Sequence, residues 1–328
     1  MPTGAPAADS IPLPTALLTG FLGSGKTSFL RRVLADPAAQ DTAVLINEFG
    51  EVGLDHLIVD ATRPGDVVQL PNGCMCCAVK QDLAQALHRL LTGRANGSLP
   101  AFHRVVIETS GLAEPAPILY TLAADAYLEH TLRCHHVIAV IDSLLGLATL
   151  DRFAEATAQI ACADALLISK TDLEPLSPTL RQRLEAMNPT ASILDSQAVP
   201  SPMALLFAAA GSVYKPRRWA AADHTSGIAT HAVVLHAAMS RLEFAMALAG
   251  LARERGNDLL RVKGLVEFSD RPGRPAAMHA VQHTLYPPHW LEAWPDEDTT
   301  QRLVFIVRGI APDDILRRFS AGAPELLA

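Results

Sequence analysis

The stretch that most constrains this chain lies near its start. Residues 20–27 read Gly-Phe-Leu-Gly-Ser-Gly-Lys-Thr and fit the pattern G-x-x-x-x-G-K-[ST]. The apolar run 15–19 precedes them and a helical pattern at 28–34 follows. A strand, a loop and a helix in this order let backbone N–H groups converge on one phosphate. The alternative is a glycine-rich turn that matches the pattern by chance. We predict phosphate contacts from Gly20, Gly23, Ser24, Gly25, Lys26, Thr27 and Ser28.

Two side chains of this loop have predicted roles of their own. Lys26 is expected to reach the β- and γ-phosphates of a nucleotide. The Thr27 hydroxyl is expected to bind Mg²⁺. The loop therefore predicts a nucleoside triphosphate with magnesium as the ligand.

The composition is that of a globular protein long enough for two domains. Its 328 residues are 49% hydrophobic, which is enough to bury a substantial core. The net charge is −7 with scattered Lys and Arg, so we expect no nucleic-acid partner. The apolar run 137–150 is interrupted by Asp142, so we expect no membrane span. Residues 1–10 lack the basic start of a secretion signal, which favours a cytoplasmic location.

Several short apolar runs end in polar residues. The run 42–46 leads into an acidic loop at 47–55, and the run 103–107 ends in Glu108. Further runs at 137–142 and 165–168 alternate with helical segments, which predicts an α/β fold with a mainly parallel sheet. In such a sheet, ligands bind at the carboxyl ends of the strands.

Glu108 and Gly111 have the spacing expected of a γ-phosphate sensor. A carboxylate at a strand end can position Mg²⁺ or water, and a glycine N–H nearby can contact phosphate. Glu108 and Lys26 are therefore the candidate catalytic residues, and Gly111 is a candidate nucleotide contact.

Residues 169–172, Ser-Lys-Thr-Asp, lie where GTPases of the P-loop class carry N-K-x-D. The Asp172 carboxylate can accept hydrogen bonds from N1–H and the 2-amino group of guanine, which adenine lacks, so GTP is favoured over ATP. Ser169 replaces the asparagine, and we expect weakened guanine selectivity. An ordinary strand-end aspartate remains the alternative. The candidate nucleotide contacts here are Ser169, Lys170 and Asp172.

Three of the five cysteines lie within four positions, ahead of a predicted helix at 79–91. Cys74, Cys76 and Cys77 offer soft donors, which favour Zn²⁺ and related thiophilic ions. Glu48 is the candidate for a fourth ligand. Buried structural thiols or a redox pair are the alternatives. The other two cysteines, Cys134 and Cys162, are expected in the core.

The pattern changes after about residue 211. We predict a disordered N-terminus at 1–10, a P-loop GTPase domain at 11–213, a polar linker at 214–229 and a smaller α+β domain at 230–328. In the last domain, strands are predicted at 232–236, 264–268, 277–285 and 302–307, and helices at 241–255 and 313–319.

Taken together, these motifs resemble the CobW-type family of metal-handling P-loop GTPases. The stretches that carry the resemblance are 20–27, 47–55, Gly-Cys-Met-Cys-Cys at 73–77, Glu-Thr-Ser-Gly-Leu-Ala-Glu-Pro at 108–115, and 169–172. The second domain looks like the family's C-terminal domain, so the resemblance covers nearly the whole chain.

The resemblance implies a metallochaperone or metal insertase that hydrolyses GTP slowly. Lys26 and Thr27 would hold phosphate and Mg²⁺, and Glu108 would take the acidic strand-end role. A transition metal, Zn²⁺ or Co²⁺, would be bound by Glu48, Cys76 and Cys77 with Cys74 nearby, and delivered to an unidentified client metalloprotein. The chain lacks the His-rich stretch that many members carry, so any metal-buffering role of that stretch is not implied.

These observations favour a nucleotide-controlled switch. Bound γ-phosphate and Mg²⁺ would order residues 47–55 and 108–111 and draw Glu48 toward the cysteine loop. One alternative is a P-loop kinase that uses ATP on a small molecule, and another is a non-catalytic metal sensor or structural zinc protein. A homodimer is one candidate assembly.

Overall fold

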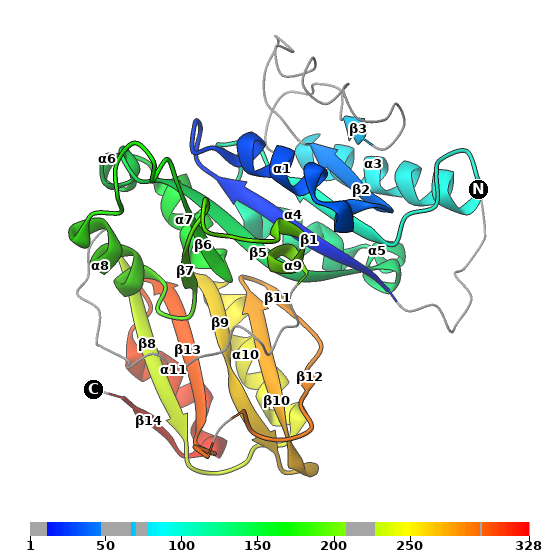
Figure 1. Ribbon diagram of the computed structural model, residues 1–328. Coiled ribbons are helices and arrows are strands. Elements are labelled where there is room, and N and C mark those ends of the chain that lie inside the picture. The colour runs from blue at the N-terminus through cyan, green and yellow to red at the C-terminus, as the bar shows by residue number, and fades with distance from the viewer. Residues whose placement is uncertain (1–11, 47–66, 70–77, 208–226, 296, 328) are drawn as a thin grey trace. The chain divides into compact units, whose positions relative to one another are not determined.

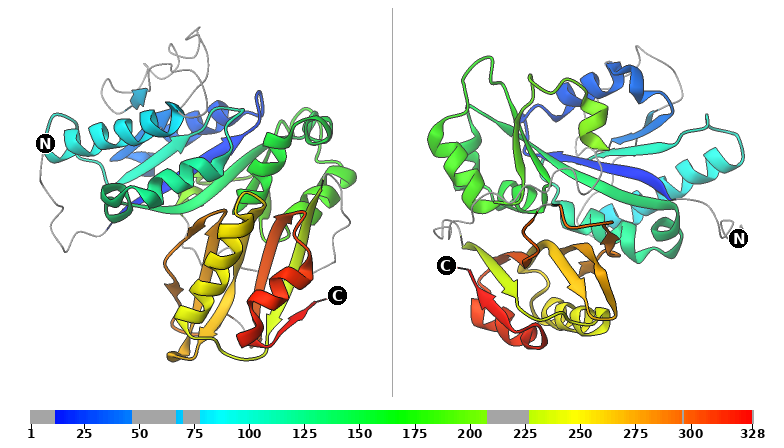
Figure 2. Two further views of the ribbon diagram at one scale, coloured as in Figure 1. Left: turned by 180° about the vertical axis from the view of Figure 1, so that it is seen from behind. Right: turned by 60° about the horizontal axis from the view of Figure 1, so that its bottom comes forward.

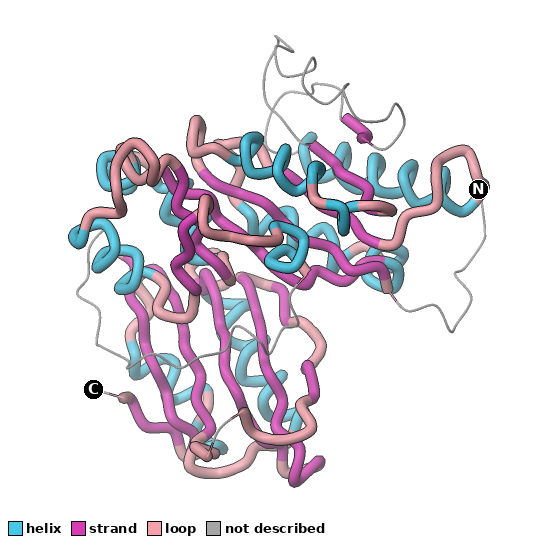
Figure 3. The backbone as a smooth tube through the Cα atoms, in the orientation of Figure 1, coloured by secondary structure: helices cyan, strands magenta, loops and turns pink. Residues whose placement is uncertain are grey.

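Two β-sheets organise the part of the chain that the structure describes (Figures 1 and 3). This computed structural model describes residues 12–46, 67–69, 78–207, 227–295 and 297–327. The chain divides into two compact units. The first comprises Met1–Gln159, Ala163–Leu176 and Ile193–Ala208, and the second Ile160–Cys162, Ser177–Ser192 and Ala209–Ala328. The N-terminus predicted to be disordered lies outside the described residues, and the domain boundaries stay a prediction.

The sheet of the first unit has the strand order β3-β2-β4-β1-β5-β6-β7. Neighbouring strands from β3 across to β6 pair in parallel, which confirms the predicted α/β class. The strands are β1 (Leu13–Gly20), β2 (Thr42–Ile46), β3 (Val67–Gln69), β4 (Arg104–Glu108), β5 (Leu132–Asp142), β6 (Ala165–Ser169) and β7 (Ser192–Asp195).

The central strand β1 is buried on both faces. Ala16 and Leu18 pack in one cluster with Phe29 and Met203 from two covering helices, while Leu17, on the opposite face, is also fully buried. A strand with two buried faces has a continuous apolar run, and this run made it recognisable in the sequence. The connecting helices are α1 (Lys26–Ala35), α3 (Ala78–Ala95), α4 (Pro115–Ala124), α5 (Ala126–Thr131), α6 (Gly146–Arg152), α7 (Ala154–Cys162) and α9 (Pro202–Leu206) (Figure 1).

The strand order brings three strand ends together. β4 lies between β2 and β1, and its last residue, Glu108, is level with Ile46 of β2 and Leu18 of β1. Parallel strands end at the same edge of the sheet. The loops that follow β1, β2 and β4 therefore all leave from one place.

The second unit is built on an antiparallel sheet, of order β11-β10-β9-β13-β8-β14, with β12 paired to β10. Helices α10 (Arg241–Arg255) and α11 (Pro312–Arg318) lie against one face of it (Figure 2). The predicted α+β character is therefore present. The strands are β8 (Ile228–Leu235), β9 (Leu259–Phe268), β10 (Arg271–Val281), β11 (Thr284–Leu285), β12 (His289–Trp290), β13 (Gln301–Arg308) and β14 (Pro324–Leu326).

Aromatic rings fill the core between this sheet and its helices. Phe244 of α10 meets Phe268 and Phe319 edge to face, with ring centroids 5.6 and 5.5 Å apart, and Phe305 meets Phe319 at 5.5 Å. Ser240 begins α10 with a capping box that Glu243 completes.

The single strand predicted at 277–285 is wrong, because the structure has a hairpin there. β10 and β11 pair antiparallel around Gln282, which has a φ of 49°. A turn at a glutamine without glycine or proline carries no strong sequence signal.

Two segments from the middle of the chain belong to the second unit. α8 (Pro178–Met187) is one of them, and the carbonyl of its Ala186 accepts a hydrogen bond from the Thr230 hydroxyl. In the other, Ala161 packs with Ile228, Leu260 and Ile306. None of the helices in the described ranges is both long and apolar enough to cross a bilayer.

Candidate functional site

The loop between β1 and α1 has the geometry of an anion cradle. The predicted strand, loop and helix are present, with β1 ending at Gly20 and α1 beginning at Lys26. Gly20 has a φ of 142°, and a Cβ there would lie 2.3 Å from the carbonyl oxygen of Val140. Gly25 caps α1 with a φ of 94°. Only glycine fits the first position, and both positions require backbone conformations that favour it.

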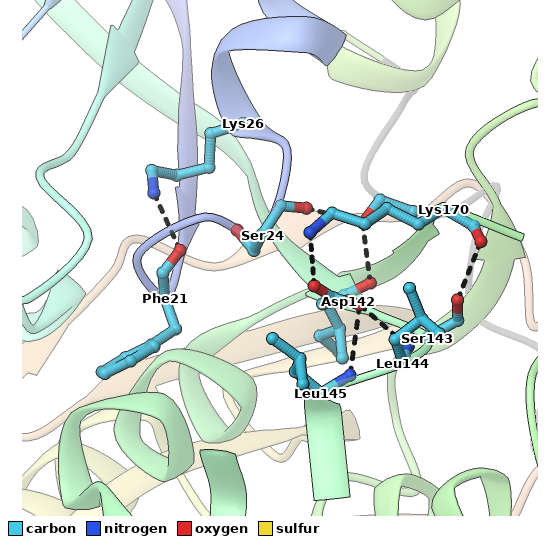
Figure 4. A network of polar contacts seen from close by, with 10 residues as sticks. Phe21, Ser24, Lys26, Asp142, Ser143, Leu144, Leu145 and Lys170 are labelled. Atoms are coloured by element: carbon cyan, nitrogen blue, oxygen red, sulfur yellow. Dashed lines mark hydrogen bonds and ion pairs between the residues drawn. The ribbon is translucent and has the colours of Figure 1, made fainter. Parts of the chain in front are cut away.

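Lys26 is held against this loop. Its Nζ donates to the carbonyl oxygens of Gly20 at 2.8 Å and Phe21 at 3.1 Å, the second of which is drawn in Figure 4. The side chain is buried, with 8% of the residue exposed. The loop's own carbonyls therefore hold the ammonium beside the backbone turn in which a phosphate is predicted to bind.

Thr27 and Glu108 meet across the sheet edge. The Thr27 hydroxyl donates to Oε1 of Glu108 at 3.2 Å, and Glu108 is buried at the end of β4. A hydroxyl and a carboxylate are hard oxygen donors of the kind that Mg²⁺ prefers. The two predicted magnesium-site residues are thus neighbours, although they lie 81 positions apart in the chain.

The loop that follows Glu108 packs directly on residues 20–26, the turn between β1 and α1, which we call the phosphate loop. Thr109 donates its backbone N–H to the Leu18 carbonyl at 2.9 Å and its hydroxyl to Thr19 Oγ1 at 2.9 Å. A Cβ on Gly111 would lie 2.7 Å from the backbone nitrogen of Leu22, so this close approach also requires glycine. The predicted sensor residues therefore lie next to the turn in which a phosphate is predicted to bind.

Two buried hydroxyls at this edge suit an anionic ligand. Ser24 in the phosphate loop and Ser110 after Glu108 are 3% and 4% exposed. Neither Oγ has a hydrogen-bond partner among the described residues. Buried donors are normally satisfied, so unsatisfied ones beside a glycine-rich cradle fit a phosphate-bearing ligand.

Ser169 connects the candidate base-binding segment to the phosphate loop. Its hydroxyl lies 2.6 Å from the Ser24 carbonyl oxygen and 3.2 Å from that of Ile141. The Gly25 backbone passes close by, since a Cβ there would lie 3.3 Å from Ser169 Cβ. The residue that replaces asparagine therefore still braces the loop, through a hydroxyl instead of an amide.

Lys170 and Asp142 form an ion pair beside this brace, with Nζ and Oδ2 2.5 Å apart (Figure 4). Asp142 also accepts backbone N–H groups from Leu144 at 2.8 Å and Leu145 at 3.2 Å through Oδ1. Lys170 itself has a φ of 58°. Asp142 was not predicted as a site residue, because in the sequence it stands out only as the end of a predicted strand.

Asp172, the candidate guanine reader, has an exposed side chain. The preceding Thr171 donates its hydroxyl to Asp195 Oδ1 at 2.7 Å, which connects the segment to the last residue of β7. The loop after β7 is held from α1, because Arg32 donates to the carbonyls of Ser196 and, at 2.9 Å, Val199. Arg32 was not predicted, and its position within a helix gave no signal for it.

The predicted transition-metal ligands lie outside the described residues. These are Glu48, Cys74, Cys76 and Cys77. Within the described ranges, no group of three or more His, Cys, Asp or Glu side chains could hold a metal ion. Cys162 is buried as predicted, whereas Cys134 is only half-buried.

Comparisons with known proteins match both units. Residues 14–195 match the family model described as CobW/HypB/UreG, nucleotide-binding domain, and residues 228–323 match the cobalamin synthesis protein cobW C-terminal domain. The zinc chaperone YjiA of Escherichia coli K12 is 33% identical over 319 residues, which cover 95% of this chain and 98% of that protein. The zinc chaperone CobW of Pseudomonas aeruginosa is 28% identical over 346 aligned residues, covering 92% and 89%.

Solved structures agree with these matches. The crystal structure of Zn(II)-bound YjiA GTPase from E. coli superposes with a TM-score of 0.71 at 27% identity, covering 95% of this chain and 99% of that chain. The fold, the phosphate loop and both family models lead to one conclusion: the chain belongs to the CobW/HypB/UreG family, with a CobW C-terminal domain.

Proposed function

We propose that this chain is a GTP-hydrolysing metallochaperone. It would bind Zn²⁺ or Co²⁺ at Cys74, Cys76, Cys77 and Glu48, and deliver the metal to a client protein under control of GTP binding and hydrolysis. The observation that carries the nucleotide part is the meeting of Thr27 and Glu108 at 3.2 Å beside a phosphate loop. The metal part is supported by the four residues themselves and by the relatives, which are named zinc chaperones.

Each residue of the candidate site has a separate proposed role in phosphoryl transfer. Catalysis of this reaction depends on positioning and on stabilising negative charge, because the protein forms no covalent bond. Lys26 would stabilise charge on the β- and γ-phosphates, and Thr27 with Glu108 would hold Mg²⁺. Bound Mg²⁺ supplies charge neutralisation on the phosphate oxygens. The N–H of Gly111 would contact the γ-phosphate.

Guanine selection is proposed for Asp172. Its exposed carboxylate is available to accept two hydrogen bonds from the N1–H and 2-amino group of guanine. Two contacts would support the base-binding segment. Lys170 pairs with Asp142, and the Ser169 hydroxyl bonds to the Ser24 carbonyl in the phosphate loop. The cytoplasmic location and the homodimer stay predictions.

The deciding test is a comparison of nucleotides on the purified full-length chain. We expect tighter binding of GTP than ATP, and multiple-turnover release of phosphate from GTP. Lys26→Ala should lower that rate at least about 100-fold, the usual effect of removing one electrostatic contact to the transition state. Arg31→Ala, which changes an exposed residue of the same helix, is the matched control and should leave the rate unchanged.

The same measurement separates the alternatives. A preference for ATP, with phosphate transferred to a small molecule, would favour a kinase. GTP binding without turnover, even with added metal, would favour a sensor or a structural zinc protein. Loss of both nucleotide and metal binding in Lys26→Ala would indicate a misfolded variant, so metal content is measured alongside.

A further inference from the structure

Gln159 is a buried polar side chain whose amide contacts a loop of the candidate nucleotide site. It lies in α7 and is 1% exposed. Its Nε2 donates to the carbonyl oxygens of Gly111 and Ala113, both at 3.1 Å. Since both partners are acceptors, only the NH₂ end of the amide can face them. Burying an amide is costly unless it is hydrogen-bonded, so this double contact accounts for a polar residue at this position.

The loop that Gln159 holds is the one that follows β4. Its start is fixed by Thr109, which bonds to Leu18 and Thr19 of β1. Its far end is fixed by the hydrogen bond from Gln159 to the Ala113 carbonyl, and α4 begins two residues later at Pro115. Ser110, with its unsatisfied buried hydroxyl, lies between Thr109 and the first Gln159 contact at Gly111. Gly111 also lies close to the backbone of Leu22.

The anchoring has a consequence for nucleotide binding. A γ-phosphate can gain contacts from this loop only when the loop lies against the phosphate loop. If the loop is already held there, a nucleoside triphosphate does not have to supply the free energy of ordering it on binding. A diphosphate has no γ-phosphate to contact the loop, so its affinity does not depend on that ordering.

We propose that Gln159 is a positioning residue that sets the preference of the site for nucleoside triphosphate over diphosphate. It acts through the carbonyls of Gly111 and Ala113 and touches no nucleotide. This rests on the proposed function, in which the ligand pair is GTP and GDP. The two donors of the Gln159 amide connect α7 to this loop.

The test measures the affinities of a non-hydrolysable GTP analogue and of GDP for the full-length chain with Mg²⁺. Gln159→Leu keeps the side-chain size but removes both donors. We expect the analogue to bind about tenfold more weakly, which corresponds to roughly 1.4 kcal/mol, while GDP binding changes less than about twofold. Hydrogen exchange of residues 109–114 in the nucleotide-free chain should become faster in this variant, because one anchor is lost.

Thr157→Val, a near-isosteric change of another buried residue in α7, is the matched control and should leave the ratio of the two affinities unchanged. An unchanged ratio of the GTP-analogue and GDP affinities in Gln159→Leu would overturn the proposal. This includes equal weakening of both ligands, which a general loss of structure would cause.

Adenine nucleotides separate this proposal from the proposed function. If the wild type binds the ATP analogue and ADP in place of the guanine pair, the GTP assignment fails. The effect of Gln159→Leu on the triphosphate-to-diphosphate ratio of the adenine pair then decides the positioning role. A wild type that binds none of the four nucleotides would overturn both.

Discussion

Ser169 braces the phosphate loop although it stands where the N-K-x-D motif has an asparagine. Its hydroxyl lies 2.6 Å from the Ser24 carbonyl oxygen and connects β6 to the phosphate loop. Ser169→Ala would remove a donor from a buried carbonyl, which costs about 1–3 kcal/mol. We expect GTP and GDP affinities to fall together, by about fivefold or more, because both ligands use the same loop. Isothermal titration of both nucleotides checks this.

Thr131→Val is the matched control for that variant, since it removes a hydroxyl that donates to the Tyr127 carbonyl at 2.7 Å in α5. It should leave both affinities unchanged. A change in GTP affinity alone in Ser169→Ala would contradict the role assigned to Ser169. That result would place Ser169 with Gln159, among residues that distinguish the two nucleotides.

The residues predictable from sequence are those whose role follows from local pattern. Lys26 and Thr27 belong to a loop whose glycines need particular dihedral angles, and Glu108 ends a strand that the apolar run makes visible. Gln159 could not be predicted, because its partners lie 46 and 48 positions earlier and are backbone carbonyls, which every residue has. Its own helix gave no signal either, because α7 also contains the polar residues Glu155 and Thr157.

At the scale of elements, α3 and α5 are connected through one carboxylate. Asp125 caps α5 by accepting the N–H groups of Tyr127 and Leu128, both at 3.0 Å, and it lies 2.9 Å from Nε2 of His88 in α3. Partial burial raises the pKa of Asp125, but the hydrogen bond with His88 and the two N–H groups lower it more. The net pKa therefore lies below the ordinary value of 3.8.

Asp125→Ala should destabilise the chain by about 1–2 kcal/mol at pH 7, as loss of an N-cap does. Because the folded pKa is the lower one, the carboxylate stabilises the fold fully above pH 3.8 and loses this effect as pH falls through the folded pKa. The difference in free energy of unfolding between wild type and variant should therefore decrease below pH 3.8 in denaturant titrations.

Glu129→Ala, which changes an exposed residue of the same helix, is the control, and its free energy of unfolding should stay within about 0.5 kcal/mol of the wild-type value. A difference between wild type and Asp125→Ala that does not change with pH would contradict the role assigned to Asp125.

Element boundaries depended on tertiary pairing that the sequence does not display. β10 begins at Arg271, and two prolines and a glycine follow within four residues, a composition that argues against a strand. Pairing with β9 nevertheless starts at Arg271, and a shift in register between Arg271 and Pro275 absorbs the disfavoured residues. β5 likewise starts at Leu132 because Leu13 of β1 pairs with it.

At the scale of the whole molecule, sequence order and structural unit do not coincide. Arg261 of β9 is fully buried in the second unit and donates to the carbonyl of Cys162. Cys162 ends α7, whose earlier residue Gln159 belongs to the first unit. A boundary drawn from composition divides a chain at one point, whereas here short segments from the middle of the sequence complete the second core.

The proposed switch makes a prediction about the full chain. Ile46, the last residue of β2, pairs with Glu108, the candidate magnesium carboxylate, and Glu48 follows Ile46 by two positions in the sequence. If bound triphosphate raises zinc affinity, zinc must raise triphosphate affinity by the same factor, since coupling between two sites is reciprocal. We expect about tenfold in each direction, within the usual range of such couplings. Zinc titrations against a competing chelator, with and without a non-hydrolysable GTP analogue, give one factor, and nucleotide titrations with and without zinc give the other.

The double variant Cys76→Ser with Cys77→Ser controls for metal bound by the nucleotide itself. It should abolish the coupling between zinc and nucleotide while the chain still binds GTP. Identical zinc affinities in both nucleotide states would remove the switch and leave a metal site and a nucleotide site that act independently.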